Sequence, residues 1–142
     1  MEKMQGLVHD FLAAKMVNMI TYAEDGSKSS RPMTNFNEDP YSKMWFATYS
    51  VTKKVKDIER DNRVFISFPS YQEGKFWEIE GTAAFETDEE VSEKWRWWYL
   101  YWHPEADANG WGLEGDGSYV DHRRIIDVEP KSVKLVDAPK KA

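Results

Sequence analysis

The stretch from Phe76 to Glu86 constrains the fold of this chain more than any other, because its side chains alternate in character. Apolar or small residues stand at every second position: Trp77, Ile79, Gly81, Ala83 and Phe85. Acidic or small residues fill the positions between them: Glu78, Glu80, Thr82, Ala84 and Glu86. Successive side chains of a strand point to opposite faces, so the pattern predicts a strand with one face in a core and the other toward water. Such one-sided burial is typical of antiparallel sheets.

Short strands separated by turn residues are predicted along most of the chain. They cover residues 17–22, 29–36, 44–48, 64–68, 76–86, 119–128 and 133–136. The last two are separated by Glu129-Pro130-Lys131. Helices are predicted over residues 2–15, 53–60 and 88–102, and Thr87 with Glu90 forms a capping box for the last of them. Six to seven antiparallel strands with few helices favour a mainly β fold with flanking α-helices, a small barrel forming a single domain over residues 1–142.

The composition argues against several classes of function. The net charge is -6 and no block of basic residues stands out, so neither nucleic acid nor an anionic membrane is expected as a partner. The chain has no cysteine, which excludes disulfides and thiolate chemistry and fits a reducing cytoplasm. No signal peptide or membrane span is visible, and a cytoplasmic location is expected. The histidines follow no metal-ligand pattern, and no metal is expected.

A long loop is predicted over residues 103–117, which are rich in Gly, Asp and Asn. Its segment 105–110 spaces oxygen atoms like the start of a calcium loop, but Asp116 stands where a bidentate Glu is needed. A flap is therefore the preferred interpretation.

The residues between Arg31 and Val55 carry the clearest indication of function. Arg31 lies on one predicted strand, Thr48 ends the next, and Thr52, Lys53 and Lys54 stand at a predicted helix start. An arginine on a strand is usually a surface residue, and Thr52 also suits a plain N-cap. However, cations at a helix start oppose the helix dipole, so their placement needs a reason. Arginine, lysine and free N–H groups together suit a phosphate monoester on a flat aromatic group.

The order and spacing of these motifs resemble the flavin mononucleotide (FMN)-binding split-barrel family related to pyridoxamine 5'-phosphate oxidase, in its general-stress-protein-26-like branch. The resemblance spans roughly residues 5–137. The motifs that carry it are Arg31-Pro32-Met33, Trp45-Phe46-Ala47-Thr48, Thr52-Lys53-Lys54, Gly81-Thr82-Ala83 and Val128-Glu129-Pro130. It implies a split β-barrel of the FMN-binding type with FMN as cofactor.

The resemblance also implies a set of cofactor-binding residues. They are Arg31, Pro32, Met33, Phe46, Ala47, Thr48, Thr52, Lys53, Lys54 and Trp98. Thr48, Thr52 and Lys54 match the family positions one by one, whereas Lys53 is either a second phosphate ligand or a solvated side chain. The neighbouring backbone at Pro32 could address the flavin ring.

The predicted helix 88–102 carries a stripe of large apolar residues: Val91, Trp95, Trp98 and Trp102. Such a stripe is most often core, but this one is heavy for one side of a small barrel. It predicts a homodimer interface, and the resemblance places the cofactor at such an interface, with one Trp near the flavin ring.

The resemblance implies a flavin-dependent oxidoreductase of unknown substrate with a stress-related role, for which NAD(P)H is a candidate electron donor. A non-catalytic module that carries or senses a flavin or heme is the alternative. No catalytic acid or base can be named from the residues. Val136 stands where many relatives have an aromatic residue, and the arginine-containing C-terminal segment of true pyridoxamine phosphate oxidases is missing. Oxidation of vitamin B6 is therefore not expected.

Overall fold

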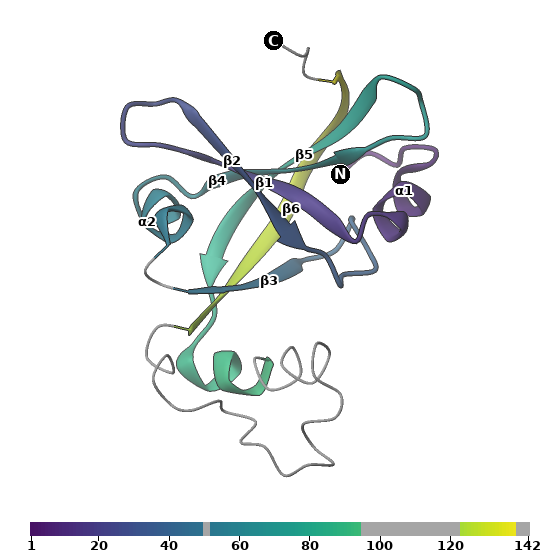
Figure 1. Ribbon diagram of the computed structural model, residues 1–142. Coiled ribbons are helices and arrows are strands. Elements are labelled where there is room, and N and C mark those ends of the chain that lie inside the picture. The colour runs from purple at the N-terminus through teal and green to yellow at the C-terminus, as the bar shows by residue number, and fades with distance from the viewer. Residues whose placement is uncertain (50–51, 95–122, 139–142) are drawn as a thin grey trace.

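The computed structural model describes residues 1–49, 52–94 and 123–138. Its six strands form one antiparallel sheet in the order β2-β1-β4-β5-β6-β3. The strands are Met16–Tyr22 (β1), Lys28–Thr34 (β2), Met44–Tyr49 (β3), Arg63–Pro69 (β4), Lys75–Phe85 (β5) and Arg123–Asp137 (β6). The sheet curls into a half-barrel whose two edges, β2 and β3, are not paired with each other (Figure 1). The prediction of a mainly β split barrel is confirmed.

Two short helices flank the sheet at opposite ends, Leu7–Ala13 (α1) and Lys53–Arg60 (α2) (Figure 1). The bounds of α2 are those predicted, whereas α1 is shorter than the predicted helix 2–15. Gly6 has a φ of 86°, which lies in the left-handed region, so the helix begins only after Gly6. None of the helices in the described ranges combines the length and apolar character needed to cross a bilayer.

Strand β5 has the one-sided burial that its alternation predicts. Trp77, Ile79 and Ala83 are buried, while Glu80 and Thr82 between them are exposed. Gly81 continues the buried face for a steric reason. A Cβ there would lie 2.7 Å from the carbonyl oxygen of Glu129 and 2.8 Å from Cγ1 of Val128 on β6. The close approach of β6 therefore requires glycine at this position.

The C-terminal strand corrects the sequence prediction, because β6 runs without a break through Glu129-Pro130-Lys131. Glu80 pairs with Ser132 but Gly81 pairs with Pro130, so Lys131 is an extra residue in β6. This bulge lies directly beside Pro130, and bulges are among the few places in a sheet where proline is found. The two predicted strands are thus one bent strand. Residues 119–122, where the first was predicted to begin, lie outside the described residues.

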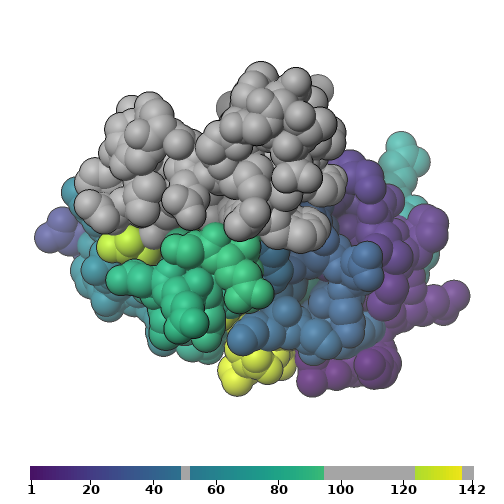
Figure 2. Space-filling model, turned by 90° about the horizontal axis from the view of Figure 1, so that it is seen from below, coloured from purple at the N-terminus to yellow at the C-terminus, as the bar shows by residue number. Residues whose placement is uncertain are grey.

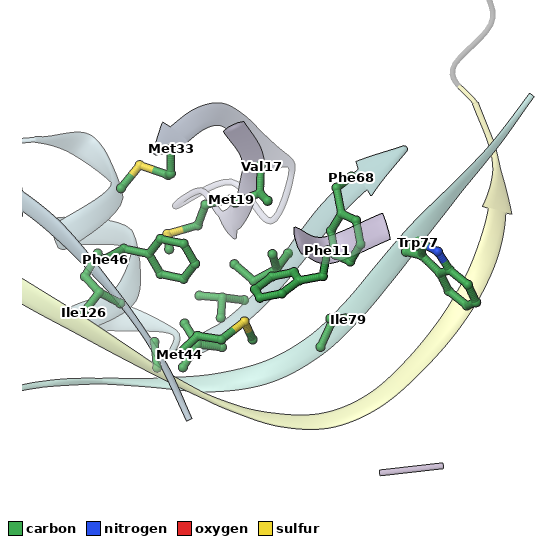
Figure 3. Close-up of a cluster of buried hydrophobic side chains, with 14 of the residues drawn as sticks. Phe11, Val17, Met19, Met33, Met44, Phe46, Phe68, Trp77, Ile79 and Ile126 are labelled. Atoms are coloured by element: carbon green, nitrogen blue, oxygen red, sulfur yellow. The ribbon is translucent and has the colours of Figure 1, made fainter. Parts of the chain in front are cut away.

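The core fills the inside of the curl and joins both edges of the sheet. Met33 from β2, Phe46 from β3 and Ile126 from β6 cluster at one end (Figure 3). At the other end Phe11 of α1 packs edge-on against Phe68 of β4, with ring centroids 5.3 Å apart. Burying each such side chain contributes about 1.5–3 kcal/mol. The two unpaired edges are therefore held near each other by side chains, not by a hydrogen-bond ladder.

A further helix begins after β5 and is described over residues 88–94. The hydroxyl of Thr87 accepts a hydrogen bond from the backbone N–H of Glu90 at 3.3 Å, which confirms the predicted cap. Val91 is buried against Ile125, with Trp45 and Ala47 at its margin. Figure 2 shows this helix (green) beside the segment that contains β3 (blue). The helix thus covers the outer face of β3 and β6.

Candidate anion-binding site

Three of the predicted site residues meet where the two edges of the sheet approach each other beside α2. Arg31 comes from β2, Thr48 from β3 and Lys54 from the first turn of α2. The ammonium group of Lys54 donates a hydrogen bond of 2.8 Å to the hydroxyl of Thr48. Arg31 lies close enough for its charge to act on Lys54. Segments far apart in the sequence therefore form one cationic cluster.

Lys54 is buried, with only 7% of its surface exposed. Burial and, second, the positive charge of Arg31 lower the pKa of Lys54 to about 8. Both causes disfavour the charged form, since one removes water from the ammonium group and the other repels it. No carboxylate in the described part of the chain forms an ion pair with Lys54 or Arg31. The cluster therefore has uncompensated positive charge, which an anion would neutralise.

Arg31 has a buried donor that none of the described residues satisfies. Its terminal NH2 group donates to the hydroxyl of Ser29 at 2.8 Å, but its buried Nε has no hydrogen-bond partner. Leaving such a donor unsatisfied costs about 1–3 kcal/mol, and more for a charged group. An acceptor atom supplied by a ligand would remove this cost. The orphaned Nε is thus a second, independent sign of an anion site.

Lys53, the neighbouring lysine, has a different environment. Its side chain is 56% exposed and its ammonium group pairs with the carboxylate of Asp57 at 3.0 Å. Asp57 also accepts hydrogen bonds from Thr21 and Arg60, each at 3.0 Å. Burial alone would raise the pKa of Asp57, but the hydrogen bonds from Lys53, Thr21 and Arg60 lower it below the ordinary value. Lys53 is therefore neutralised within its own helix, on the solvent side.

Thr52 is the N-cap residue of α2, with extended backbone at φ −78° and ψ 154°. Its side chain makes no capping hydrogen bond. The plain interpretation of Thr52 as a side-chain cap therefore does not describe it. Thr52 precedes Lys54 by two residues, at the start of the same helix.

The side chains of the other predicted ligands in the described ranges have no charged or hydroxyl groups. Pro32 is exposed on β2, an edge strand, opposite Asn18. Met33 and Phe46 are buried in the core, so a ligand would meet mainly their backbone groups. Ala47 packs on the outer face near Val91. Trp98 lies outside the described residues, as do Trp95 and Trp102 of the predicted stripe and the loop 103–117.

Arg124 was not among the predicted site residues, although the sheet places it at the cluster. It lies directly opposite Thr48 in the β3–β6 pairing, so the two side chains share a face. The sequence predicted a strand through Arg124 but carried no signal for the strand with which it pairs. The register therefore adds a third cationic residue, opposite the hydroxyl residue of the cluster.

The curled antiparallel sheet and the cationic cluster at its unpaired edges define a split-barrel protein. The family described as "Pyridoxamine 5'-phosphate oxidase like" matches residues 1–110, and the chain belongs to that family. The family prediction is thus confirmed. No match is found among curated proteins.

Many solved structures share the fold. A protein related to general stress protein 26 from Clostridium acetobutylicum is 16% identical with a TM-score of 0.66, covering 91% of this chain and 84% of that one. An F420 reductase is 16% identical with a TM-score of 0.65, covering 93% and 98%. A pyridoxamine 5'-phosphate oxidase-related, FMN-binding protein from Nostoc punctiforme is 10% identical with a TM-score of 0.61, covering 92% and 79%. At such identities the likeness shows the fold alone.

Proposed function

We propose that this protein binds FMN and that the cluster of Arg31, Thr48 and Lys54 holds its phosphate. The observation that carries the proposal is a buried lysine beside a buried arginine donor, with no carboxylate paired to either among the described residues. A phosphate monoester has a charge of about −1.5 to −2 and three strong acceptor oxygens. It would supply both the missing charge and the missing acceptor.

The residues present fit that group in their chemistry. Arg31 and Lys54 would bind phosphate oxygens, and the hydroxyls of Thr48 and Thr52 would complete the set. The backbone edge of β2 at Pro32 and Met33 would face the flavin ring, because an edge strand leaves backbone groups available. When bound, the flavin supplies the redox chemistry, and the protein positions it.

A titration of the apo-protein with FMN and with riboflavin tests this assignment. The two ligands share the flavin ring and differ in the phosphate, so FMN should bind far more tightly. Each charged hydrogen bond of this type contributes about 1.5–3 kcal/mol. Equal affinity for both ligands in a fluorescence titration would show that the cluster has another role. Cofactor extraction with mass spectrometry identifies the native ligand and includes coenzyme F420 and heme as alternatives.

We also propose that the protein is a flavin-dependent oxidoreductase that works as a homodimer with the cofactor at the subunit interface. Support for a dimer comes from apolar side chains exposed on α1 and the start of β1: Val8, Leu12 and Met16. The helix that begins at residue 88 would form another part of the interface, with Trp98 near the ring. Sedimentation of the FMN-loaded protein at micromolar concentration should show a dimer. A monomer would contradict the proposal.

A non-catalytic flavin carrier is the second candidate. The observation in its favour is that the described side chains of the cluster are cations and hydroxyls, with no carboxyl or imidazole placed among them. Adding NADH or NADPH to the yellow protein separates the two functions. Bleaching of the flavin supports the oxidoreductase, whereas yellow protein inert to both donors supports the carrier.

A further inference from the structure

Lys54 makes fewer hydrogen bonds to the described residues than a buried ammonium group needs. A charged ammonium group has three N–H donors, and among the described residues Lys54 uses one of them, on Thr48. The charged group that acts on it is Arg31 on β2, and Arg124 on β6 lies opposite its hydrogen-bond partner Thr48. Asp57 on the same helix is engaged with Lys53, Arg60 and Thr21. Lys54 is therefore buried among cations and neutral groups.

We propose that the anion site takes up a proton when it binds a phosphate dianion, and that Lys54 is the residue that accepts the proton. This inference rests on the proposed function. The step balances without covalent chemistry: the lone pair of the neutral amine takes a proton from water or buffer, and the resulting ammonium group pairs with the phosphate. The site thereby changes from a partly neutral to a fully cationic state as it fills.

The physical reason is that a bound phosphate opposes the two effects that lower the pKa of Lys54, which are burial and the charge of Arg31. In the free protein, burial and the charge of Arg31 lower the pKa of Lys54 to about 8, so near that pH about half of the molecules have a neutral amine. A dianion within hydrogen-bond distance favours the ammonium form and raises the pKa of Lys54 in the complex. The complex therefore binds more protons than the separate partners.

Linkage then makes FMN affinity fall with rising pH. Since protonation of Lys54 accompanies binding, affinity is nearly constant between the second pKa of the phosphate and the pKa of the free site, and it falls about tenfold between about pH 7 and pH 9. The second ionisation of a phosphate monoester, near about pH 6, lies below this window and does not contribute to it. Retention of the cofactor would thus be weaker under alkaline conditions.

Isothermal titration calorimetry with FMN, in buffers of differing protonation enthalpy, measures the proton uptake directly. We expect uptake of about half a proton at about pH 8 and nearly one at about pH 9. Lys54→Arg should bind FMN without uptake, because a guanidinium group stays charged throughout this range. Lys56→Arg is the matched control, since Lys56 is exposed on the same helix, and it should retain the uptake of the natural chain.

The outcomes separate this inference from the proposed function. FMN binding with no buffer-dependent heat at pH 8 to 9, or with uptake retained in Lys54→Arg, overturns the inference and leaves the FMN site standing. Absence of FMN binding in the natural chain overturns both. If Lys54→Arg does not bind FMN, NMR of protein with 13C-labelled lysine decides the question. The Lys54 signal should titrate near about pH 8 in the free protein and stay charged to a higher pH in the complex.

Discussion

Two buried clusters of charge lie on opposite faces of the β3–β6 pair, and they differ in how their charge is compensated. On the inner face, Arg31 and Lys54 stand without a paired carboxylate in the described part of the chain. On the outer face, Glu86 and Asp127 form a carboxyl pair, in which the side chain of Glu86 is 1% exposed. Lys94 pairs with Glu86, and Lys43 lies 3.6 Å from Asp127.

The charge of the carboxyl pair is compensated within the fold. Burial and, second, the hydrogen bond and negative charge of Glu86 raise the pKa of Asp127 to about 6. Among the described residues, one oxygen of each carboxyl is buried without a partner, and below about pH 6 a proton on Asp127 would be shared between the two groups. Lys43 and Lys94 supply the opposite charge. This cluster therefore joins the helix 88–94 to the sheet, and cations of the fold itself compensate its charge.

The difference between the clusters shows how buried charge can be interpreted. A buried charge with partners on neighbouring elements is explained by the fold, as it is for Glu86 and for Asp57. A buried charge with no opposite partner lowers the free energy of unfolding, because no interaction within the fold offsets the loss of its hydration. The inner cluster is of the second kind, which is why we assign it to a ligand. The predictions below test that contrast.

Removing Lys94, the lysine that pairs with Glu86 in the outer cluster, should have the largest effect on stability. Lys94→Met leaves Glu86 buried beside Asp127 without its cation, and we expect a loss of about 2 kcal/mol in the free energy of unfolding at neutral pH. The loss should shrink near about pH 5, where Asp127 is protonated and no longer adds a second negative charge beside Glu86. Urea unfolding at the two pH values measures it. An unchanged stability would mean that the outer cluster does not hold the helix.

Removing the lysine of the inner cluster should instead affect binding. Lys54→Ala should weaken FMN binding at least about tenfold, equivalent to about 1.4 kcal/mol. The apo-protein should melt at the same or a slightly higher temperature, because a buried, uncompensated cation is lost. Lys54→Met, which keeps the volume, controls for packing.

Lys53→Ala is the matched comparison at the same helix start. Because Lys53 pairs with Asp57 and is largely exposed, its loss should reduce FMN affinity clearly less than the loss of Lys54. If Lys53→Ala is the more damaging, the assignment of the two lysines is reversed. If neither substitution changes FMN affinity, the anion site is elsewhere.

The pH dependence of stability should distinguish the carboxyl pair from ordinary carboxylates. The pKa of Asp127 in the folded protein, about 6, lies above its ordinary value of 3.8, so the folded state binds more protons than the unfolded state between these values. The stability associated with this pair is therefore full below that window and is lost as pH rises through it. Asp127→Asn removes the titration. Relative to that variant, the natural chain should be more stable at about pH 4.5 than at about pH 7 by urea unfolding. A constant difference would contradict the shared proton.

The smallest effect should come from Arg124, at the margin of the inner cluster. Arg124 lies opposite Thr48, and it is only partly buried. Arg124→Gln should weaken FMN binding about threefold, equivalent to about 0.7 kcal/mol. Arg60→Gln, on the far end of α2, is the control for net charge. Equal effects of the two variants would show that Arg124 acts only through the overall charge of the protein.

The sequence by itself determined the elements whose pattern is local. The alternation of β5, the bounds of α2 and the cap at Thr87 follow from neighbouring residues, because side-chain period and capping are properties of short segments. The same holds for the motifs at Arg31 and Lys54, which the resemblance to the family joined into one site. The family and the split barrel were therefore predictable before any contact was known.

Only the tertiary structure decided which residues face each other across the barrel. Pairing of β6 with β3 places Arg124 at the site, and the bulge at Lys131 turns two predicted strands into one. The folded chain also buries Lys54 while leaving Lys53 with Asp57. These facts depend on register and burial between segments distant in the chain, and no local pattern specifies them. Whether a cation is compensated is likewise a property of the folded neighbourhood, and here it separates the residue assigned to a ligand from the one assigned to the fold.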